Sequence, residues 1–419
     1  MTSVLQELKK ELNDPNGSRI ITLHGKLHLN IDRSGGFTIG KNAIQGILRI
    51  RRSNIIIDGS DAELYVDISN CEGSDHALFL VENAARNVVF RNISLQVHIQ
   101  NEHHCTRSFH VIRNTGFGTR IENCNIRLYS ERQLNLIGIS NDGNLYTHLT
   151  TPADNFSITD STVRVECVPT EFPENCTVFG VHNRLANSIS VQNCFIYATI
   201  RGNSEKQKAI GLYTNGRFGR YVGNNIKANA CHNVGKRKEQ AHAIGFENNG
   251  PYSILTSNNI VGEWGGRCVG LYNSKEALYA NVTANKILST HTICGRSVEH
   301  RADNCIISSN ILTSTSRNAR LLDLHASYCT INGNYMEALL STHICPSGCG
   351  IYAPERSAGN IITHNTIRNP ASCGMYLDDN DGIINENSIQ TSGLSCIAPK
   401  NTSPSLRFKL DEKSICSVE

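Results

Sequence analysis

The chain of 419 residues is poor in charged, aromatic and proline residues, and each shortage excludes a class of protein. Charged residues make up 18%, aromatic residues 6%, and there are only 10 prolines and one tryptophan. A disordered chain would be rich in proline and charge, and a coiled coil would be rich in Ala, Glu, Lys and Leu, so neither class fits. The 40 Lys and Arg against 37 Asp and Glu leave a net charge of +3, which argues against a nucleic-acid partner. No run approaches about 18 consecutive apolar residues, so no membrane-spanning helix is predicted.

Asparagine, a polar and uncharged residue, is abundant instead, with 46 copies. At the N-terminus, residues 4–12 predict a charged amphipathic helix and lack the basic-then-apolar pattern of a secretory signal. The 16 cysteines are scattered, so we interpret them mostly as buried small side chains in a reducing cytoplasm. A secreted protein that was trimmed of its signal and holds disulfides is the alternative.

A short pattern recurs along the chain, in which a hydrophobic strand leads to an Asn-centred turn and then to another hydrophobic residue. It is clearest in the second half, as VGNNI, TSNNI, TANKI, SSNIL, NGNYM, THNTI and NENSI. About twelve repeats of unequal length can be counted, and units of this kind made of short strands indicate a solenoid. Helical repeats are excluded because the units lack a 3.6-residue period. Asparagine suits the corners because it tolerates left-handed backbone, and stacked copies can form amide ladders.

These corners, together with SRIITLHGKLHL at residues 18–29 after the short helix, resemble the right-handed parallel β-helix superfamily of pectin-lyase-like proteins. The resemblance runs over roughly residues 15–400. It implies an all-β, single-stranded right-handed parallel β-helix of about twelve coils, with a capping helix at 1–17, the solenoid at 18–400 and a tail at 401–419. The fold hosts lyases, hydrolases, epimerases, transferases and adhesins, so it does not by itself define an activity.

One column of the solenoid is chemically unusual. In the fragments IGLY, IGFE, VGLY, RSVE, RLLD, CGIY and CGMY the third residue is apolar and is expected to point inward, so the fourth points outward. The predicted outward column is Tyr213, Glu247, Tyr272, Glu299, Asp323, Tyr352 and Tyr376. Tyrosine rings would supply platforms for sugars, and the carboxylates would supply acid and base groups. A register slip of one residue would turn this column inward, and tyrosine ladders also stabilise β-helices by stacking alone.

The three acids predict glycosidase chemistry. Glu299 and Asp323 would lie about 5 Å apart on adjacent coils, as in a retaining pair, and their repulsion should raise one of the two pKa values. Glu247 and Glu299, two coils apart at about 9.6 Å, would instead suit an inverting pair.

Further candidates flank the column. Arg301 could bind an anionic sugar, and His300 and His325 are alternative general acids or bases. Trp264, in GEWGGR, is predicted to lie in a loop near Glu247, where sugar stacking and ordinary packing are equally good interpretations.

No cofactor or metal is assigned. The cluster at 98–105, HIQNEHHC, matches no standard zinc spacing, and a surface loop explains it better. The acidic turn LDDNDG at 377–382 could hold Ca²⁺, as in pectate lyases of the superfamily, but an ordinary Asx turn is the better interpretation.

The favoured hypothesis is an enzyme that cleaves or rearranges glycosidic bonds of an oligo- or polysaccharide, by hydrolysis or intramolecular transfer through paired carboxylates. The stretches 321–336 and 360–369 are similar to inulin fructotransferases, which implies a homotrimer. A polysaccharide lyase or uronate epimerase is the second hypothesis. A non-catalytic adhesin or carbohydrate-binding protein is the third.

Overall fold

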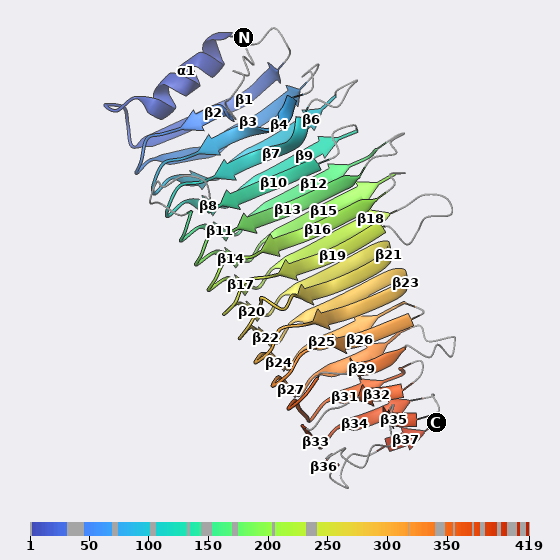
Figure 1. The fold of residues 1–419 in the computed structure, drawn as a ribbon. Helices are drawn as coiled ribbons and strands as arrows, with labels where there is room; N and C mark the ends of the chain where they lie inside the picture. Colours follow the sequence, from blue (N-terminus) through green and yellow to red (C-terminus); the bar gives the residue numbers. More distant parts are fainter. Residues whose placement is uncertain are drawn as a thin grey trace. The chain divides into compact units, whose positions relative to one another are not determined.

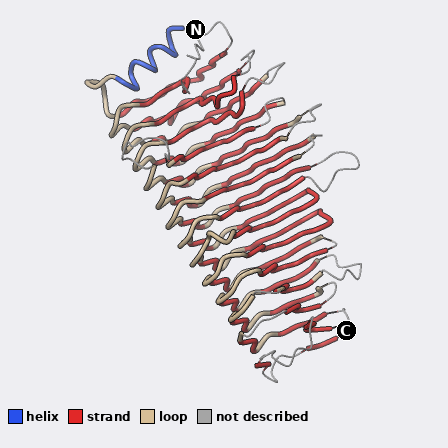
Figure 2. Tube along the Cα trace, in the orientation of Figure 1, coloured by secondary structure: helices blue, strands red, loops and turns tan. Residues whose placement is uncertain are grey.

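The computed structural model describes residues 2–31, 46–68, 74–100, 106–131, 135–143, 153–169, 175–202, 206–231, 241–316, 318–339, 348–354, 357–370, 373–377, 382–391, 395–399, 409–410 and 416–418. They form two compact units. Unit 1 is Met1–Arg217 with His232–Gly235, and unit 2 is Phe218–Cys231 with Lys236–Glu419. Each unit consists of coils of short parallel strands, as Figures 1 and 2 show. This confirms the predicted all-β parallel β-helix. In the described part of the chain, no helix has the length and apolarity needed to cross a membrane.

The described strands form three parallel sheets, which we number in the order in which the chain enters them after its first corner. The first sheet holds very short strands, the second follows the Asn-rich corner, and the third follows a loop of variable length. In unit 1 the first sheet is formed by the start of β3 (Ile56–Ile68), β5 (Val89–Arg91), β8 (Arg120–Glu122), β11 (Ser157–Thr159) and β14 (Ser190–Gln192). Its second sheet is formed by β1 (Ile20–Ile31), the end of β3, β6 (Ser94–Ile99), β9 (Asn125–Ser130), β12 (Thr162–Cys167) and β15 (Phe195–Arg201). Its third sheet is formed by β2 (Gly46–Ile50), β4 (Ser74–Asn83), β7 (Thr106–Asn114), β10 (Asn135–Asp142), β13 (Cys176–Arg184) and β16 (Gln207–Thr214).

Unit 2 repeats the arrangement, with two long strands that bend from the second sheet into the third. Its first sheet is formed by β17 (Arg220–Val222), β20 (Ile254–Thr256), β22 (Asn281–Thr283), β24 (Ile306–Ser308), β27 (Thr330–Asn332), β30 (Ile361–Thr363), β33 (Ile383–Asn385) and β36 (Lys409–Leu410). Its second sheet is formed by β18 (Asn225–Cys231), the starts of β21 (Asn259–Asn273) and β23 (Lys286–His300), β25 (Ile311–Ser314), β28 (Tyr335–Ala338), β31 (Thr366–Arg368), β34 (Ser388–Thr391) and β37 (Cys416–Val418). Its third sheet is formed by β19 (Ala241–Asn248), the ends of β21 and β23, β26 (Asn318–Leu324), β29 (Cys349–Ala353), β32 (Cys373–Leu377) and β35 (Ser395–Pro399).

Helix α1 (Thr2–Asn13) packs against the first coils of unit 1. Its Leu8 and Leu12 line an apolar space together with Leu48, Ile50 and Leu64 of the coils. The helix therefore covers apolar side chains that a solenoid would otherwise leave exposed at its first coil.

The Asn-rich corners of unit 2 contain a continuous ladder of buried side-chain amides. Each Asn donates through Nδ2 to Oδ1 of the Asn on the next coil, over 2.9–3.0 Å. The ladder consists of Asn224, Asn258, Asn285, Asn310, Asn334, Asn365 and Asn387. It confirms the predicted amide stacking, and it satisfies polar groups that would otherwise be buried without partners.

The left-handed backbone lies elsewhere than predicted in these corners. In unit 2 the residue before the ladder Asn adopts the positive φ, as at Ala284 (57°) and Ser309 (56°). In unit 1 the left-handed residue is itself Asn or Asp, as at Asn123 (49°) and Asp160 (49°). The prediction that the corner Asn supplies the left-handed conformation is therefore correct for unit 1 and wrong for unit 2, where Asn instead supplies hydrogen bonds.

Candidate functional site

The outward column on the third sheet of unit 2 keeps its predicted register. The Cα partners in successive coils are Glu247 and Tyr272, Tyr272 and Glu299, Glu299 and Asp323, Asp323 and Tyr352, and Tyr352 and Tyr376. The apolar residue before each is fully buried, as at Phe246, Val298 and Leu322. Tyr213 belongs to unit 1, where it pairs with His182 and stacks on its ring at 4.8 Å.

A bend in each third-sheet strand places two consecutive residues in the core. Before Glu299, both Ser297 and Val298 are fully buried, so the next outward residue upstream is Arg296. Most coils have glycine at the bend. At Gly270 there is no room for a side chain, because an added Cβ would lie only 2.7 Å from the Ser297 carbonyl oxygen.

The coils that carry Glu299 and Asp323 have Ser297 and Leu321 in place of that glycine, and an arginine precedes each of them. The sequence contained this signal as R-S-V-E and R-L-L-D, but simple alternation did not assign Arg296 and Arg320 to the outward column.

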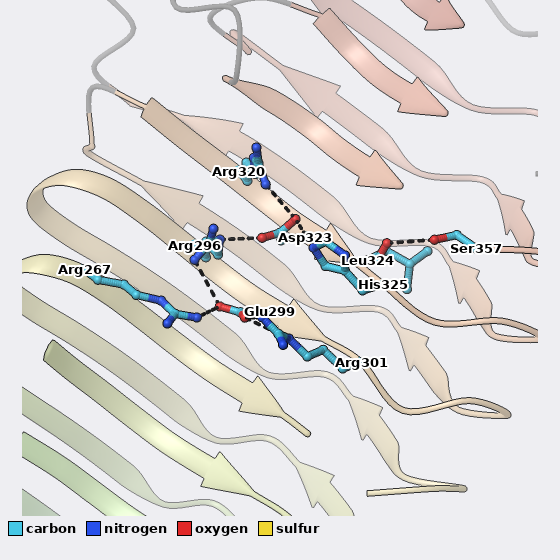
Figure 3. Close-up of polar contacts among 9 residues, drawn as sticks. All are labelled: Arg267, Arg296, Glu299, Arg301, Arg320, Asp323, Leu324, His325 and Ser357. Atoms are coloured by element: carbon cyan, nitrogen blue, oxygen red, sulfur yellow. Dashed lines mark hydrogen bonds and ion pairs between the residues drawn. The ribbon is translucent and has the colours of Figure 1, made fainter. Parts of the chain in front are cut away.

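The arginine–carboxylate cluster, shown in Figure 3, consists of Arg267, Arg296, Glu299, Arg301, Arg320, Asp323 and His325. Glu299 lies at its centre with a side chain that is 0% exposed. Arg301 binds one carboxylate oxygen through Nε at 3.1 Å and Nη2 at 2.7 Å. Arg296 binds the other oxygen at 3.2 Å, and Arg267 also contacts it. Glu299 thus anchors three guanidinium groups and cannot reach a glycosidic oxygen.

Asp323 is held in the same way. Its side chain is 1% exposed and contacts Arg296, Arg320 Nη1 at 3.1 Å and His325 Nε2 at 3.1 Å. Burial alone would raise the pKa of Asp323, but the hydrogen bond from His325 and the charges of Arg296 and Arg320 hold that pKa below its usual value. The predicted rise of a carboxyl pKa therefore does not occur at Asp323, because arginines separate the two acids electrostatically.

Glu247 is also more enclosed than predicted. It is 9% exposed and lies beside Tyr272 in the neighbouring strand. Burial raises the pKa of Tyr272, so its phenol stays protonated at neutral pH. The Arg301 guanidinium lies 5.8 Å from the centre of the Tyr272 ring.

His300 does not lie in the outward column. It is 0% exposed, its Nδ1 lies 3.1 Å from Asn273 Nδ2, and its Nε2 lies 3.7 Å from Cys329 Sγ. It takes the place of an Asn in a second, interior amide stack that includes Asn248 and Asn273. The hypothesis that His300 acts on a substrate is not compatible with this burial, since the residue after an outward one points inward.

Trp264 lies within strand β21 and not in a loop. It has a positive φ of 53° at the point where β21 passes from the second to the third sheet, and it is 43% exposed.

Tyr213, Tyr352 and Tyr376 stack on neighbouring rings and do not form open platforms. The Tyr352 and Tyr376 rings are 5.0 Å apart and nearly parallel, at 17°. The Arg320 guanidinium lies 3.6 Å from the Tyr352 ring centre and comes from the preceding coil, so the two faces of this ring are both covered. Tyr352 therefore offers its phenol edge to a ligand.

His325 is the accessible titratable group of the cluster, with a side chain that is 36% exposed. Its Nε2 faces Asp323 Oδ1, which favours the tautomer with Nε2 protonated and Nδ1 free to accept a proton. Its backbone is fixed by a 2.8 Å bond from its N–H to the His300 carbonyl. The preceding carbonyl, of Leu324, accepts from Ser357 Oγ at 3.1 Å, and the Tyr352 ring centre lies 6.3 Å from that of His325.

The two weaker metal candidates lie partly outside the described residues. Of the cluster at 98–105, residues 101–105 lie outside the described residues, as do residues 378–381 of the acidic turn. Among the residues that the structure describes, no three His, Cys, Asp or Glu side chains gather closely enough to hold a metal ion.

Four arginines and one histidine surround two carboxylates, so the cluster has an excess of positive charge. Such a surface is suited to an anionic group, because guanidinium ions bind carboxylate and phosphate through paired hydrogen bonds.

Comparisons with known proteins support the fold. No family model matches the chain, and no curated protein matches it significantly. Among solved structures, the A-module of the mannuronan C-5 epimerase AlgE6 from Azotobacter vinelandii is similar over 100% of this chain and 95% of its own, with a TM-score of 0.52 and 11% identity. The Dettilon tailspike protein is similar over 95% of this chain and 64% of its own, at 12% identity and a TM-score of 0.46. The A-module of AlgE4 from Azotobacter vinelandii gives a TM-score of 0.44 at 10% identity, over 93% of this chain and 91% of its own. The chain thus has the right-handed parallel β-helix fold.

Proposed function

We propose that the arginine–carboxylate cluster of unit 2 binds a uronate-type saccharide and removes the proton from the carbon next to its carboxylate. The observation that carries this proposal is the burial of Glu299 and Asp323 beneath arginines. A glycosidase pair needs one acid that is protonated and accessible, and neither residue meets that requirement. The acids instead orient a set of cations and one histidine.

The chemistry follows from the accessible groups. Arg301 and Arg320 would neutralise the substrate carboxylate, which lowers the cost of an enediolate-like intermediate. His325 Nδ1 would accept the proton, with Asp323 stabilising the imidazolium that forms. Collapse of the intermediate can expel the sugar linked at C-4, or return a proton from the opposite side to give the C-5 epimer. The phenol of Tyr352 would supply the proton in either case.

A carbohydrate substrate is also in keeping with the neighbour that shares the fold at a TM-score of 0.52, whose name describes a mannuronan C-5 epimerase. At 11% identity that neighbour gives no residue roles, so the assignment depends on the geometry of the cluster.

The deciding experiment is deuterium exchange at C-5 of polymannuronate and polygalacturonate in heavy water, followed by NMR. Ultraviolet absorbance of unsaturated uronates distinguishes elimination from epimerisation in the same samples. We expect exchange with the wild type and at least a hundred-fold loss, by order of magnitude, in His325→Asn. The Tyr352→Phe variant should slow product formation more than it weakens binding.

His364→Asn is the matched control, because His364 is an exposed histidine of unit 2 that pairs with Glu386 far along the chain from the cluster. It should keep full activity. Binding of polyuronate without any exchange would leave a non-catalytic carbohydrate-binding protein as the better conclusion. Release of saturated products, lost in Glu299→Gln, would restore the paired-carboxylate hypothesis.

A further inference from the structure

A second candidate site lies in unit 1, on the outward side of the second sheet. A groove of about 380 Å³ crosses strands β1, β3, β6, β9 and β12. This volume lies within the range of small-molecule sites. The groove belongs to another sheet and another unit than the arginine–carboxylate cluster, and the proposed function makes no use of it.

Two columns of side chains, two residues apart along each strand, form the groove. The register aligns His28, Tyr65, Gln96, Arg127 and Arg164 in one column. The other column is Asp67, His98, Tyr129 and Glu166. Adjacent strands lie about 4.8 Å apart, so neighbouring side chains of a column are close enough to contact one ligand together.

The aromatic rings of the groove are not stacked face to face. His28 and Tyr65 meet edge to face at 78°, and His98 and Tyr129 are tilted by 53°. This differs from Tyr352 and Tyr376, whose rings cover each other at 17°. A tilted ring leaves part of its face available to the C–H groups of a sugar.

The acids of the groove already have partners. Asp67 contacts His28 Nε2 at 2.5 Å and His98 Nδ1 at 3.7 Å. Glu166 contacts Arg164 at 3.3 Å, and Arg201 on the next coil at 3.2 Å. Glu166 is therefore paired with two arginines, and Asp67 contacts two histidine rings.

Arg127 differs from these groups. It is exposed, and no carboxylate of the described residues forms an ion pair with it. Its Cα partner in the next coil is Arg164, so the two arginines project from adjacent positions on the same face of the sheet. Like charges at directly paired positions are unfavourable, and a bound anion would relieve the repulsion.

We propose that this groove is a second saccharide-binding site that takes a carboxylated sugar, with Arg127 binding the carboxylate and Tyr129 and His98 packing against the ring. The inference does not depend on the proposed function, because it concerns binding in unit 1 alone.

The test is a calorimetric titration with short oligouronates of the wild type, Arg127→Ala, Arg320→Ala and the double variant. The arginine–carboxylate cluster and the groove together predict two sites in the wild type, one in each single variant and none in the double variant. Tyr129→Ala should weaken the groove site about ten-fold, which is the scale of one lost ring contact. Neutral cello-oligosaccharides should bind the groove at least ten-fold more weakly.

Arg120→Ala is the matched control, because Arg120 is an exposed arginine of unit 1 on the first sheet, paired with Glu122 at 3.2 Å. It should leave both sites intact.

The groove proposal is overturned if Arg127→Ala keeps the wild-type number of sites and affinity. A single site that is lost in Arg320→Ala alone also overturns it and leaves the proposed function standing. A single site that is lost in Arg127→Ala alone contradicts the proposed function and supports the groove.

Discussion

At Asp323, burial and charge act on the pKa in opposite directions, and the surrounding cations prevail. Burial raises the pKa, whereas His325, Arg296 and Arg320 lower it, and the folded value lies below the unfolded value of about 3.9. A carboxyl with a lowered folded pKa stabilises the fold above its unfolded pKa, and that stability is lost as the pH falls through the folded pKa.

We therefore expect the melting temperature of unit 2 to fall as the pH drops below about 3.9, and to fall less steeply in Asp323→Asn. Fluorescence of Trp264, which lies in unit 2, can follow the unfolding at each pH. Glu276→Gln, which changes an exposed acid of the same unit, should keep the wild-type slope. Identical slopes in the wild type and Asp323→Asn would show that Asp323 has no lowered pKa.

The residues of the cluster show what the sequence can and cannot reveal at this scale. The register of Glu299 and Asp323 was predictable because the apolar Val298 and Leu322 before them have to be buried. Arg296 and Arg320 were missed because the bend in the strand breaks the two-residue period on which the prediction depended. The covering of the carboxylates could not be predicted either, since it requires guanidinium groups from three coils to converge.

At the scale of the element, the amide ladder of unit 2 has a measurable share in stability. Asn310 donates from Nδ2 to Asn334 and to the Val282 carbonyl, and its Oδ1 accepts two bonds from Asn285. Asn310→Ala would leave the polar groups of both neighbouring coils buried without partners. We expect it to lower the free energy of unfolding by about 3 kcal/mol.

Asn332→Ala is the control for this loss. Asn332 is an exposed residue of β27, and its side chain accepts a bond from Thr363 at 3.2 Å. Its replacement should change the free energy of unfolding by less than about 0.5 kcal/mol. Equal effects of the two substitutions in urea titrations would contradict a structural role for the ladder.

The corners also explain why the number of coils was easier to predict than their backbone. An asparagine such as Asn285 or Asn310 recurs at each of these corners because the ladder requires a side-chain amide at that position. The left-handed residue before it can be Ala284 or Ser309, which carry no recognisable signal. The surrounding hydrogen bonds hold these residues in a conformation that costs them about 1 kcal/mol or more each.

At the scale of the whole molecule, each coil contacts mainly the coils before and after it. A destabilising substitution in one coil should therefore destabilise its neighbours and have less effect on distant coils. Hydrogen exchange followed by mass spectrometry can test this with Asn310→Ala. We expect faster exchange in β22–β28 of unit 2 and unchanged exchange in β9 and β12 of unit 1. Faster exchange over the entire chain would show that the molecule unfolds as a single cooperative body.

The class of fold could be predicted from the sequence because the same corner returns in every coil and excludes helical repeats. The loops between the second and third sheets could not, since their lengths differ and no periodic constraint acts on them. The groove of unit 1 was missed for a related reason: His28, Asp67 and Arg127 are separated by more than one whole coil each, and only the register shows that they share a face.

The amide ladder has an evolutionary consequence. Ladder residues are 34, 27, 25, 24, 31 and 22 positions apart, yet every step uses the same donor and acceptor. A duplicated coil would therefore find its bonding partners on both sides, whatever the length of its loop. A gene encoding such a ladder can grow or shrink by one repeat at a time and still specify a sound fold, while the loops and outward faces of the new copies diverge toward new ligands.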